Sequence, residues 1–388
     1  MEKSLALGPA QCSDRAKPTA MEEQALVHRI ALSMLKGIGP VNARNLVAYC
    51  GGVDPLFTDR AIGKKLGSIP GIGSERIAAI LDKRVLTEAR KELEWVNAHG
   101  VRMLFYLDPG YPRRLRPYDD APVLLFVRGN GELDAERTVA IVGTRSPSEH
   151  GRHGTEAMVE GLRTISATVV SGLAYGVDIA AHRAALKHDL PTVGCVAHGL
   201  DRIYPGEHRE TAEAMLEHGA LVTELPHGAA FVPGNFPARN RIIAGLSDCT
   251  VVMESGLKGG SLITADIAQS YDRDVFAVPG RPTDARSAGC NRLIQQNKAA
   301  LVNSGADVVR LMEWEPRGRK PARQAALFVD LQPEEQVLVD ILKARGKVDI
   351  DELCHSSRMP QSKAAGLLLN LEFNGVVRSL PGKVYALV

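Results

Sequence analysis

Apolar side chains recur at helical spacing through the first hundred residues of the chain. From residue 22 to residue 98 they tend to be separated by three or four positions, as Leu26 and Ile30 illustrate. This period is typical of amphipathic helices, and few strand signals interrupt it. We therefore predict an all-α domain over 22–98, preceded by a disordered tail over 1–21.

The pattern changes after residue 98 to short β-branched runs that alternate with helical stretches. Such alternation is typical of a parallel sheet whose two faces are covered by helices. We therefore predict an α/β domain over 99–312. The strands expected within it are 138–142, 168–171, 192–197, 221–224, 250–254 and 275–278.

The C-terminal part of the chain is interpreted as a linker followed by a small domain. Residues 313–328 place basic side chains beside prolines, which is typical of an exposed linker. Residues 329–388 predict three short helices and a closing hairpin, and this arrangement resembles a small winged helix. Its third helix, 361–373, offers only Lys363 as a cation, whereas a DNA-reading helix needs more. We therefore favour a regulatory or protein-docking role for this domain over DNA reading.

Net charge does not by itself predict a protein that binds polyanions. The 388 residues carry 47 Lys and Arg against 45 Asp and Glu, so affinity for nucleic acid must come from the local arrangement of cations. Six scattered cysteines show no zinc-binding spacing, and no stretch approaches the roughly 20 apolar residues of a membrane span. We expect a soluble cytoplasmic protein that binds neither a metal nor a membrane.

The first strand predicted within the sheet leads into a turn suited to bind an anion. Gly143, Thr144, Arg145 and Ser146 follow the strand directly, and a helical pattern begins soon after. Glycine allows a phosphate to approach the backbone, a helix start offers free N–H groups, and arginine adds a bidentate donor. The Gly-x-Gly-x-x-Gly spacing of dinucleotide-binding folds is absent, so we expect no nicotinamide or flavin cofactor. A tight turn with a surface arginine is an equally good interpretation of this segment alone.

A second turn repeats this design after the next strand. It contains Ser171, Gly172, Tyr175 and Gly176, and it again opens a helix. Neighbouring parallel strands carry the loops that follow them to the same edge of a sheet, so the two turns are predicted to form one binding site. We interpret Asp178, at the start of this helix, as a cap rather than as a reacting group.

A third glycine-rich loop follows the strand 250–254 and combines lysine, glycine and hydroxyl side chains. Its spacing is not that of a P-loop, and no magnesium-binding acid accompanies it. Upstream, a helix start places two arginines on either side of an amide, where they could reach the same anion; an exposed helix charge is the alternative for one of them. The candidate residues of these two segments are Arg239, Asn240, Arg241, Lys258, Gly259, Gly260, Ser261 and Thr264.

No reaction centre can be assembled from the titratable residues of the chain. The sequence shows no Ser-His-Asp order around a nucleophile elbow, no pair of acids in helical register and no metal-binding cluster. We therefore predict a protein that binds several consecutive phosphates and has no catalytic residue.

Taken in order, these motifs closely resemble those of the DprA (Smf) DNA-processing family. The resemblance rests on the segments 140–145, 171–178, 199–205, 239–247, 260–265 and 278–280. It implies an extended Rossmann fold, binding of single-stranded DNA, a homodimer, and loading of the RecA recombinase onto incoming strands during natural transformation.

Carried over by position, the resemblance assigns DNA contacts to all three turns and to the upstream helix, and it adds Asn291. Three positions depart from the family pattern, since His208 replaces an asparagine, Gly259 a serine and Cys290 a threonine. These departures affect individual hydrogen bonds rather than the fold, because Gly259 still offers its backbone N–H.

Two glycine turns mark the N-terminal domain. Gly37 and Gly39 flank one isoleucine, Gly71 and Gly73 flank another, and each turn lies between helical runs. This pattern resembles tandem helix-hairpin-helix units, whose exposed N–H groups bind duplex DNA phosphates without reading sequence. We favour contact with duplex DNA over the alternative of a purely structural helical bundle. The family resemblance leaves a third alternative, a module like the sterile alpha motif.

The main rival hypothesis is an enzyme, a nucleoside monophosphate phosphoribohydrolase with a Rossmann fold. The loop 258–261 faintly resembles the glycine-rich motif of that group, and Asp266 lies near the position of its catalytic acid. The Gly-Thr step of that motif is missing, and such a hydrolase has no use for additional DNA-binding domains. A purely structural scaffold would leave the clustered arginines unexplained. We therefore expect a non-catalytic DNA-binding protein.

Overall fold

The computed structural model describes residues 19–314, 331–374, 376–380 and 383–387. The chain divides into two compact units, Met1–Arg317 and Gly318–Val388. The predicted tail over 1–21 lies outside the described residues except for its last three positions, and helix α1 already begins there at Ala20. The predicted linker over 313–328 also lies outside them, apart from its first two residues.

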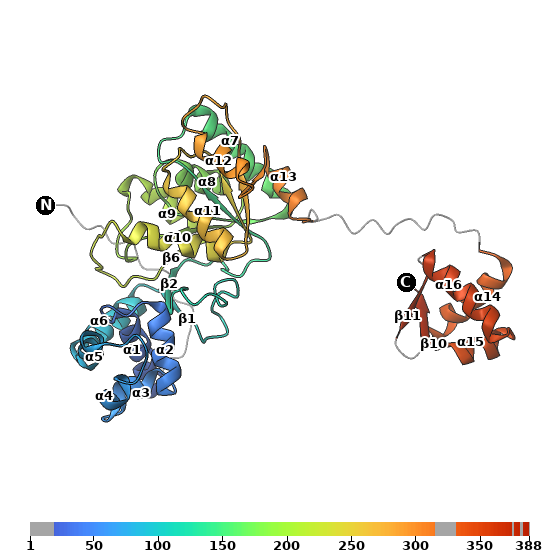
Figure 1. Cartoon of the computed structure of the whole chain (residues 1–388), viewed down its shortest axis with the longest axis horizontal. Coiled ribbons are helices and arrows are strands. Elements are labelled where there is room, and N and C mark those ends of the chain that lie inside the picture. Colours follow the sequence, from blue (N-terminus) through green and yellow to red (C-terminus); the bar gives the residue numbers. More distant parts are fainter. Residues whose placement is uncertain (1–18, 315–330, 375, 381–382, 388) are drawn as a thin grey trace. The chain divides into compact units, whose positions relative to one another are not determined.

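The amino-terminal helices pack against one another within the first unit and are blue to cyan in Figure 1; we call this group of helices the N-terminal domain. They are α1 (Ala20–Met34), α2 (Pro40–Cys50), α3 (Val53–Thr58), α4 (Ile62–Leu66), α5 (Ser74–Leu81) and α6 (Arg84–Ala98). α1 begins with a capping box, in which Thr19 and Glu22 each accept a hydrogen bond from the backbone N–H of the other. Its buried face, which includes Val27 and Ile30, packs against α6. The helical period in the sequence therefore marks a real apolar face.

Within residues 19–314, nine strands form one sheet in the order β1-β2-β6-β5-β4-β3-β7-β8-β9. The strands are β1 (Arg102–Phe105), β2 (Leu124–Arg128), β3 (Thr138–Val142), β4 (Thr168–Ser171), β5 (Thr192–Cys195), β6 (Ala220–Thr223), β7 (Cys249–Val252), β8 (Asp274–Ala277) and β9 (Ala300–Leu301). Strands β3 to β9 pair in parallel, whereas β1 with β2 and β2 with β6 are antiparallel. The predicted α/β class is confirmed, but the sheet is mixed rather than wholly parallel.

The six predicted strands all form, with ends shifted by up to two residues, and three further strands were missed. β9 has two residues, and β2 is buried along its whole length, so neither shows a recognisable alternation. One apolar core runs from Leu32 and Leu46 of the helices to Phe105 of β1 and Phe126 of β2. The N-terminal domain thus covers this end of the sheet.

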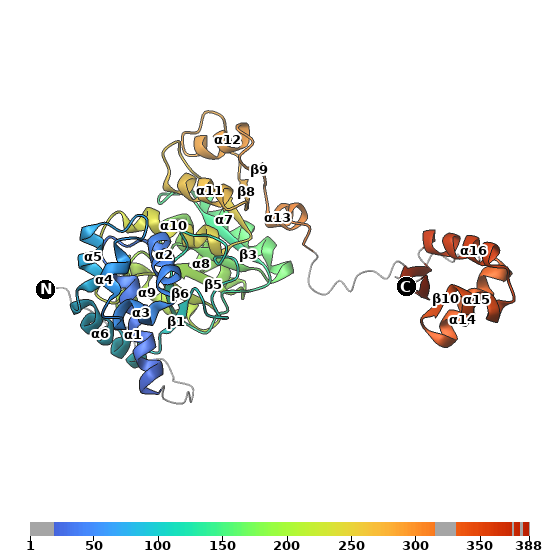
Figure 2. The ribbon, with the colours of Figure 1, turned by 60° about the horizontal axis from the view of Figure 1, so that its bottom comes forward.

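Helices cover both faces of the sheet, with α7 and α8 on one face and α10 and α11 on the other (Figure 2). The helical elements that follow β3 in this unit are α7 (Glu149–Gly161), a 3-10 turn (Leu162–Ile165), α8 (Val177–Lys187), a second 3-10 turn (Gly206–His208), α9 (Arg209–Met215), α10 (Asn235–Leu246), α11 (Gly260–Ser270), α12 (Ala288–Gln295) and α13 (Gly305–Leu311). Side chains of β3 alternate between the two cores. Val139 and Ile141 join the core of α7 and α8, whereas Ala140 and Val142 join that of α10 and α11.

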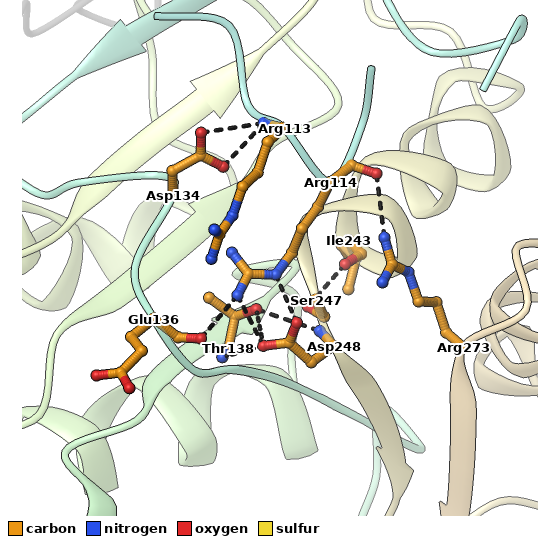
Figure 3. Close-up of polar contacts among 9 residues, drawn as sticks. All are labelled: Arg113, Arg114, Asp134, Glu136, Thr138, Ile243, Ser247, Asp248 and Arg273. Carbon is orange, nitrogen blue, oxygen red and sulfur yellow. Dashed lines mark hydrogen bonds and ion pairs between the residues drawn. The ribbon is translucent and has the colours of Figure 1, made fainter. Parts of the chain in front are cut away.

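An ion pair between buried Arg114 and half-buried Asp248 ties the amino ends of β3 and β7 to the loop between β1 and β2 (Figure 3). Arg114 donates from Nε and Nη2 to the two carboxylate oxygens of Asp248, at 2.6 and 2.9 Å. The same carboxylate accepts from the backbone N–H of Thr138 at 2.8 Å and from its hydroxyl at 3.0 Å. This bidentate geometry is the strong form of the interaction, so this end of the sheet is internally neutralised.

The loop between β6 and α10 is anchored to helix α6. The backbone N–H of His227 donates to both carboxylate oxygens of Glu92, each at 3.1 Å, and the His227 ring pairs with the same group. Trp95 stacks almost parallel on the His227 ring, with centroids 5.1 Å apart. Burial raises the pKa of Glu92, and the contacts with His227 oppose that shift. The N-terminal domain therefore fixes the start of a loop that later carries Phe231.

The C-terminal unit contains three helices and a three-stranded antiparallel sheet in the order β10-β12-β11. Its elements are α14 (Pro333–Arg345), β10 (Val348–Asp349), α15 (Ile350–Ser357), α16 (Gln361–Phe373), β11 (Val377–Leu380) and β12 (Val384–Leu387). The three predicted helices and the closing hairpin all form, and only the short β10 was missed. Across both units, no helix in the described ranges is long and apolar enough to cross a membrane.

Candidate nucleic-acid interface

Three of the predicted loops emerge at one edge of the sheet. β3 lies between β4 and β7, and all three strands are parallel, so their following loops share the carboxyl edge. The chain proceeds from β3 through β6 on one side and from β7 through β9 on the other. This reversal is the topological switch point at which open α/β sheets bind their ligands.

Gly176 allows the first two loops to pack directly against each other. Its φ is +85°, and a Cβ there would lie 2.7 Å from the Cα of Arg145 and closer still to the carbonyl oxygen of Thr144. The next residue, Val177, donates its backbone N–H to that carbonyl at 3.1 Å. Glycine is the residue that tolerates both this conformation and this contact. The loops after β3 and β4 therefore form one surface.

The start of α7 is occupied by the protein's own carboxylate. The buried Glu254 accepts hydrogen bonds from the backbone N–H of Ser148 at 3.1 Å and from its hydroxyl at 3.0 Å. The Ser148 hydroxyl in turn accepts the N–H of Gly151 at 2.9 Å. The N–H groups of Ser148 and Gly151 are therefore paired within the protein, whereas the sequence predicted N–H groups free for a phosphate. Arg145 supplies an exposed guanidinium at this turn.

Arg239 and Asp178 hold the second turn from within. Arg239 is 5% exposed and donates from Nη1 to the carbonyl of Cys195 at 2.8 Å. Asp178 is also buried and accepts the N–H of Gly172 at 3.1 Å, so it holds the turn and makes no capping hydrogen bond to α8; the cap predicted from its position is wrong. Burial lowers the pKa of Arg239 and raises that of Asp178, and the opposite charge of each neighbour counters both shifts.

An exposed aromatic cluster lies beside these arginines. The Tyr204 and Phe231 rings have centroids 4.7 Å apart, Phe231 and Phe236 are 5.3 Å apart, and the Arg145 guanidinium lies 5.6 Å from the Phe236 ring centre. Tyr204 is 45% exposed and Phe231 44%. A small cavity of about 20 Å³ is lined by Arg145, Arg239, Tyr204 and Phe236, among others. We call Tyr204, Phe231 and Phe236 the aromatic cluster. None of the three is among the site residues predicted from the sequence.

Comparison with known proteins decides the family. A family model described as DNA recombination-mediator protein A matches residues 102–313, more than half of the chain. The chain belongs to this family. A second family model, the DprA winged helix domain, matches residues 320–383. The resemblance to the DprA family stated from the motifs is therefore confirmed.

Individual relatives support the same assignment. Protein Smf of Synechocystis sp. is 36% identical over 290 residues, covering 73% of this chain and 71% of the relative. The X-ray structure of DprA from Streptococcus pneumoniae has a TM-score of 0.61 and 33% identity, covering 74% of this chain and 98% of that one. A Helicobacter pylori DprA structure, described in terms of a unique single-stranded DNA binding mode, has a TM-score of 0.50 and 29% identity, covering 55% and 95%.

Several predicted residues of this DprA family member support the site from within. Ser171 donates its hydroxyl to the carbonyl of Ile141, and Asn291 bonds both the N–H and the carbonyl of Gly280. Thr264 is buried, and Ser261 donates to a neighbouring serine. His208, where the family pattern has asparagine, pairs its Nδ1 with the carbonyl of Leu173 at 2.8 Å. That departure still supplies a hydrogen bond to the second turn.

Arg239 and Arg241 have different partners. Arg241 is mostly buried and pairs with Glu224 at 2.6 Å, whereas Arg239 lines the small cavity. Residues two apart on a helix project to different sides, so the sequence alone was enough to predict that these two side chains point in different directions. Lys258 is exposed in the loop after β7, together with Gly260, and it does not line that cavity.

The two glycine turns of the N-terminal domain adopt matching geometry. Gly37 and Gly71 have φ of +71° and +79°, while Gly39 and Gly73 cap α2 and α5 with nearly equal extended angles. All four glycines are exposed, and the isoleucines between them are buried. Arg76 lies beside both turns, since a Cβ at Gly37 would be 4.0 Å from its Cγ and its guanidinium donates to the carbonyl of Gly71.

Proposed function

We propose that this DprA family member binds single-stranded DNA at the carboxyl edge of its sheet and leaves the strand chemically intact. The observation that carries the proposal is the exposed aromatic cluster beside Arg145. Arg145 has no carboxylate partner within residues 19–314 that the structure describes. The Helicobacter pylori relative, described as binding single-stranded DNA, supports the same class of ligand.

The arginine and the aromatic rings would bind different parts of the strand. An exposed guanidinium binds a phosphate oxygen strongly and independently of sequence. Exposed aromatic rings stack on unpaired bases, and each stacked base contributes about 1–3 kcal/mol to binding. Every base has an aromatic face, so this stacking does not depend on sequence. Paired bases of a duplex do not present that face, so the combination favours a single strand.

The family resemblance extends the proposal to assembly and partners. In this view the chain acts in the cytoplasm as a homodimer that protects incoming DNA and loads the RecA recombinase onto it during natural transformation. Light scattering of the free chain tests the dimer. The lag before RecA filaments form on a single strand, with and without the chain, tests loading; an unchanged lag would count against it.

The binding site is tested by replacing Arg145. Arg145→Ala should weaken binding of a fluorescent oligothymidylate at least about tenfold, since a charge-assisted contact contributes about 1.5–3 kcal/mol. The slope of the logarithm of affinity against the logarithm of salt concentration should become less steep by about 0.7, because one phosphate contact is lost. Phe231→Ala should weaken binding while leaving that salt dependence unchanged, because stacking releases no counterions.

Arg310→Ala provides the matched control. Arg310 is an exposed arginine on α13 that contacts only Asp307 among the described residues. Its replacement should leave single-strand affinity unchanged. Equal affinities for Arg145→Ala, Phe231→Ala and the native chain would overturn the site.

The hydrolase hypothesis makes a different prediction from the same surface. An enzyme would release free base and ribose 5-phosphate from nucleoside monophosphates, whereas a binding protein would release neither. Turnover by the native chain that is lost in Asp266→Asn would favour the enzyme. Asp266 is exposed and pairs with Lys298 at 2.7 Å, so its carboxylate already has a cation partner.

A second DNA contact is proposed at the glycine turns of the N-terminal domain. Their matching geometry would present two sets of exposed backbone N–H groups to the phosphates of a duplex. A Cβ at Gly39 or Gly73 would meet no atom within 4 Å, and neither residue has positive φ. Alanine therefore fits at both positions without strain, but it crowds the N–H groups.

The double variant Gly39→Ala/Gly73→Ala tests this contact. We expect duplex affinity to fall about tenfold, with a salt dependence smaller by about 1.8 for two lost phosphates, while single-strand affinity stays constant. Gly67→Ala is the control, because that glycine also has open space and ordinary φ but lies outside the turns. Unchanged duplex binding would leave the helices as a structural bundle.

A further inference from the structure

A groove lies between helices α7 and α8, beside the proposed strand site. Its volume is about 1380 Å³, and it is lined along its length by Arg152 of α7 and by Arg183 and Lys187 of α8. Arg145 and Tyr175 of the first two turns also line it. The groove therefore begins where the loops of the carboxyl edge end.

Only some of the charged side chains in this groove have a partner of opposite charge. Five cations line it against three acids. Two of the acids have partners within the groove, since Glu156 pairs with Lys187 and Glu207 accepts the Tyr175 hydroxyl at 3.0 Å. Arg152 and Arg286 are exposed and have no carboxylate partner within the described ranges. An anion entering the groove would meet guanidinium groups whose charge the protein leaves uncompensated.

Arg145 connects the groove to the aromatic cluster. It lines both the groove and the small cavity that contains Tyr204 and Phe236. A strand whose phosphate is bound at Arg145 can thus extend in two directions, toward the aromatic cluster or between α7 and α8. The first direction offers rings for bases, and the second offers cations for phosphates.

The length of the groove suits a short run of nucleotides. The residues of α8 that line the groove run from Ile179 to Lys187, which is about 12 Å along the helix. At the 3.4 Å spacing of one strand of B-DNA, this length accommodates about four nucleotides. A single phosphate or free nucleotide would occupy one end and leave the remaining cations unused.

We infer that the α7–α8 groove binds the sugar-phosphate backbone of the same single strand, on the side of Arg145 away from the aromatic cluster. This inference rests on the proposed function and adds to it a second subsite and a direction for the strand. The groove extends the footprint by about four nucleotides and contributes affinity without contacts to bases.

The test compares oligothymidylates of about 4 and about 16 nucleotides on the full-length chain. In Arg152→Glu/Arg183→Glu, we expect affinity for the longer strand to fall at least about tenfold, and its salt dependence to fall by about 1.4 for two lost phosphate contacts. Affinity for the shorter strand, held at Arg145 and the aromatic cluster, should stay within about twofold of the native value. Arg152→Glu alone, which removes a side chain without a carboxylate partner, should show about half of the change in salt dependence.

Lys298→Glu/Arg310→Glu is the matched control, with two charges reversed at exposed positions that do not line the groove. The inference is overturned if the control weakens the longer strand as much as the groove variant does. It is also overturned if the groove variant binds both lengths like the native chain, or weakens both equally. These results leave the proposed function intact, whereas failure of the native chain to bind either length would remove that function itself.

Discussion

The two ends of strand β3 use arginine in opposite ways. At the amino end, Arg114 is buried and binds Asp248 through two nitrogens. At the carboxyl end, Arg145 is exposed, lies near the ring of Phe236, and has no carboxylate partner in the described part of the chain. One strand thus joins a neutralised arginine to an uncompensated one.

This contrast separates residues that hold the fold from residues available to a ligand. A guanidinium already bound to a carboxylate stabilises the protein but has little left for an external phosphate. The same rule applies at the start of α7, where the Glu254 carboxylate already accepts hydrogen bonds from the N–H and the hydroxyl of Ser148. Charge alone therefore does not mark a binding residue, and the state of its partners must be known.

The largest effect is expected from breaking the amino-end pair. Arg114→Ala leaves the Asp248 carboxylate without its cation and should lower the free energy of unfolding in urea by about 3–5 kcal/mol. The folded fraction should bind single-stranded DNA with native affinity. In Arg145→Ala the pattern should be reversed, with the free energy of unfolding changed by less than about 0.5 kcal/mol and DNA affinity reduced. Similar stability losses in both variants would contradict the contrast.

An intermediate effect is expected at the junction of the two carboxyl-end loops. Gly176→Ala forces a Cβ against the backbone of Thr144 and Arg145 at positive φ, which should cost about 1–3 kcal/mol of stability. It should also reduce single-strand affinity, because the loop that carries Arg145 must move. Gly206→Ala is the control, since a Cβ there meets no atom within 4 Å. Full affinity in Gly176→Ala would show that the two loops bind independently.

Much of this architecture was predictable from local patterns. Each central strand is a short β-branched run, and the parallel order alone brings the loops after β3, β4 and β7 to one edge. The family motifs then add the identity of the fold. The strand β2 was missed because burial on both of its faces replaces alternation with continuous apolar residues, and β1 because its four residues show no alternation.

The site itself depends on contacts that local patterns do not contain. Glu254 contacts Ser148 from 106 residues away in the chain, so local sequence patterns could not show that the Ser148 N–H is already paired. Phe231 and Phe236 lie close together in the sequence, but Tyr204 comes from a separate segment, and only the folded chain brings its ring beside theirs. Helical period, by contrast, could have separated Arg239 from Arg241.

The Glu92–His227 contact bears on how this protein should be dissected. A shortened chain starting after α6 would lose the carboxylate that holds His227, and with it the fixed start of the loop that carries Phe231. It would also uncover the apolar side of β1 and β2. Weak binding by such a fragment would then report a displaced loop rather than a missing domain, so point substitutions in the intact chain are the sounder way to assign DNA contacts.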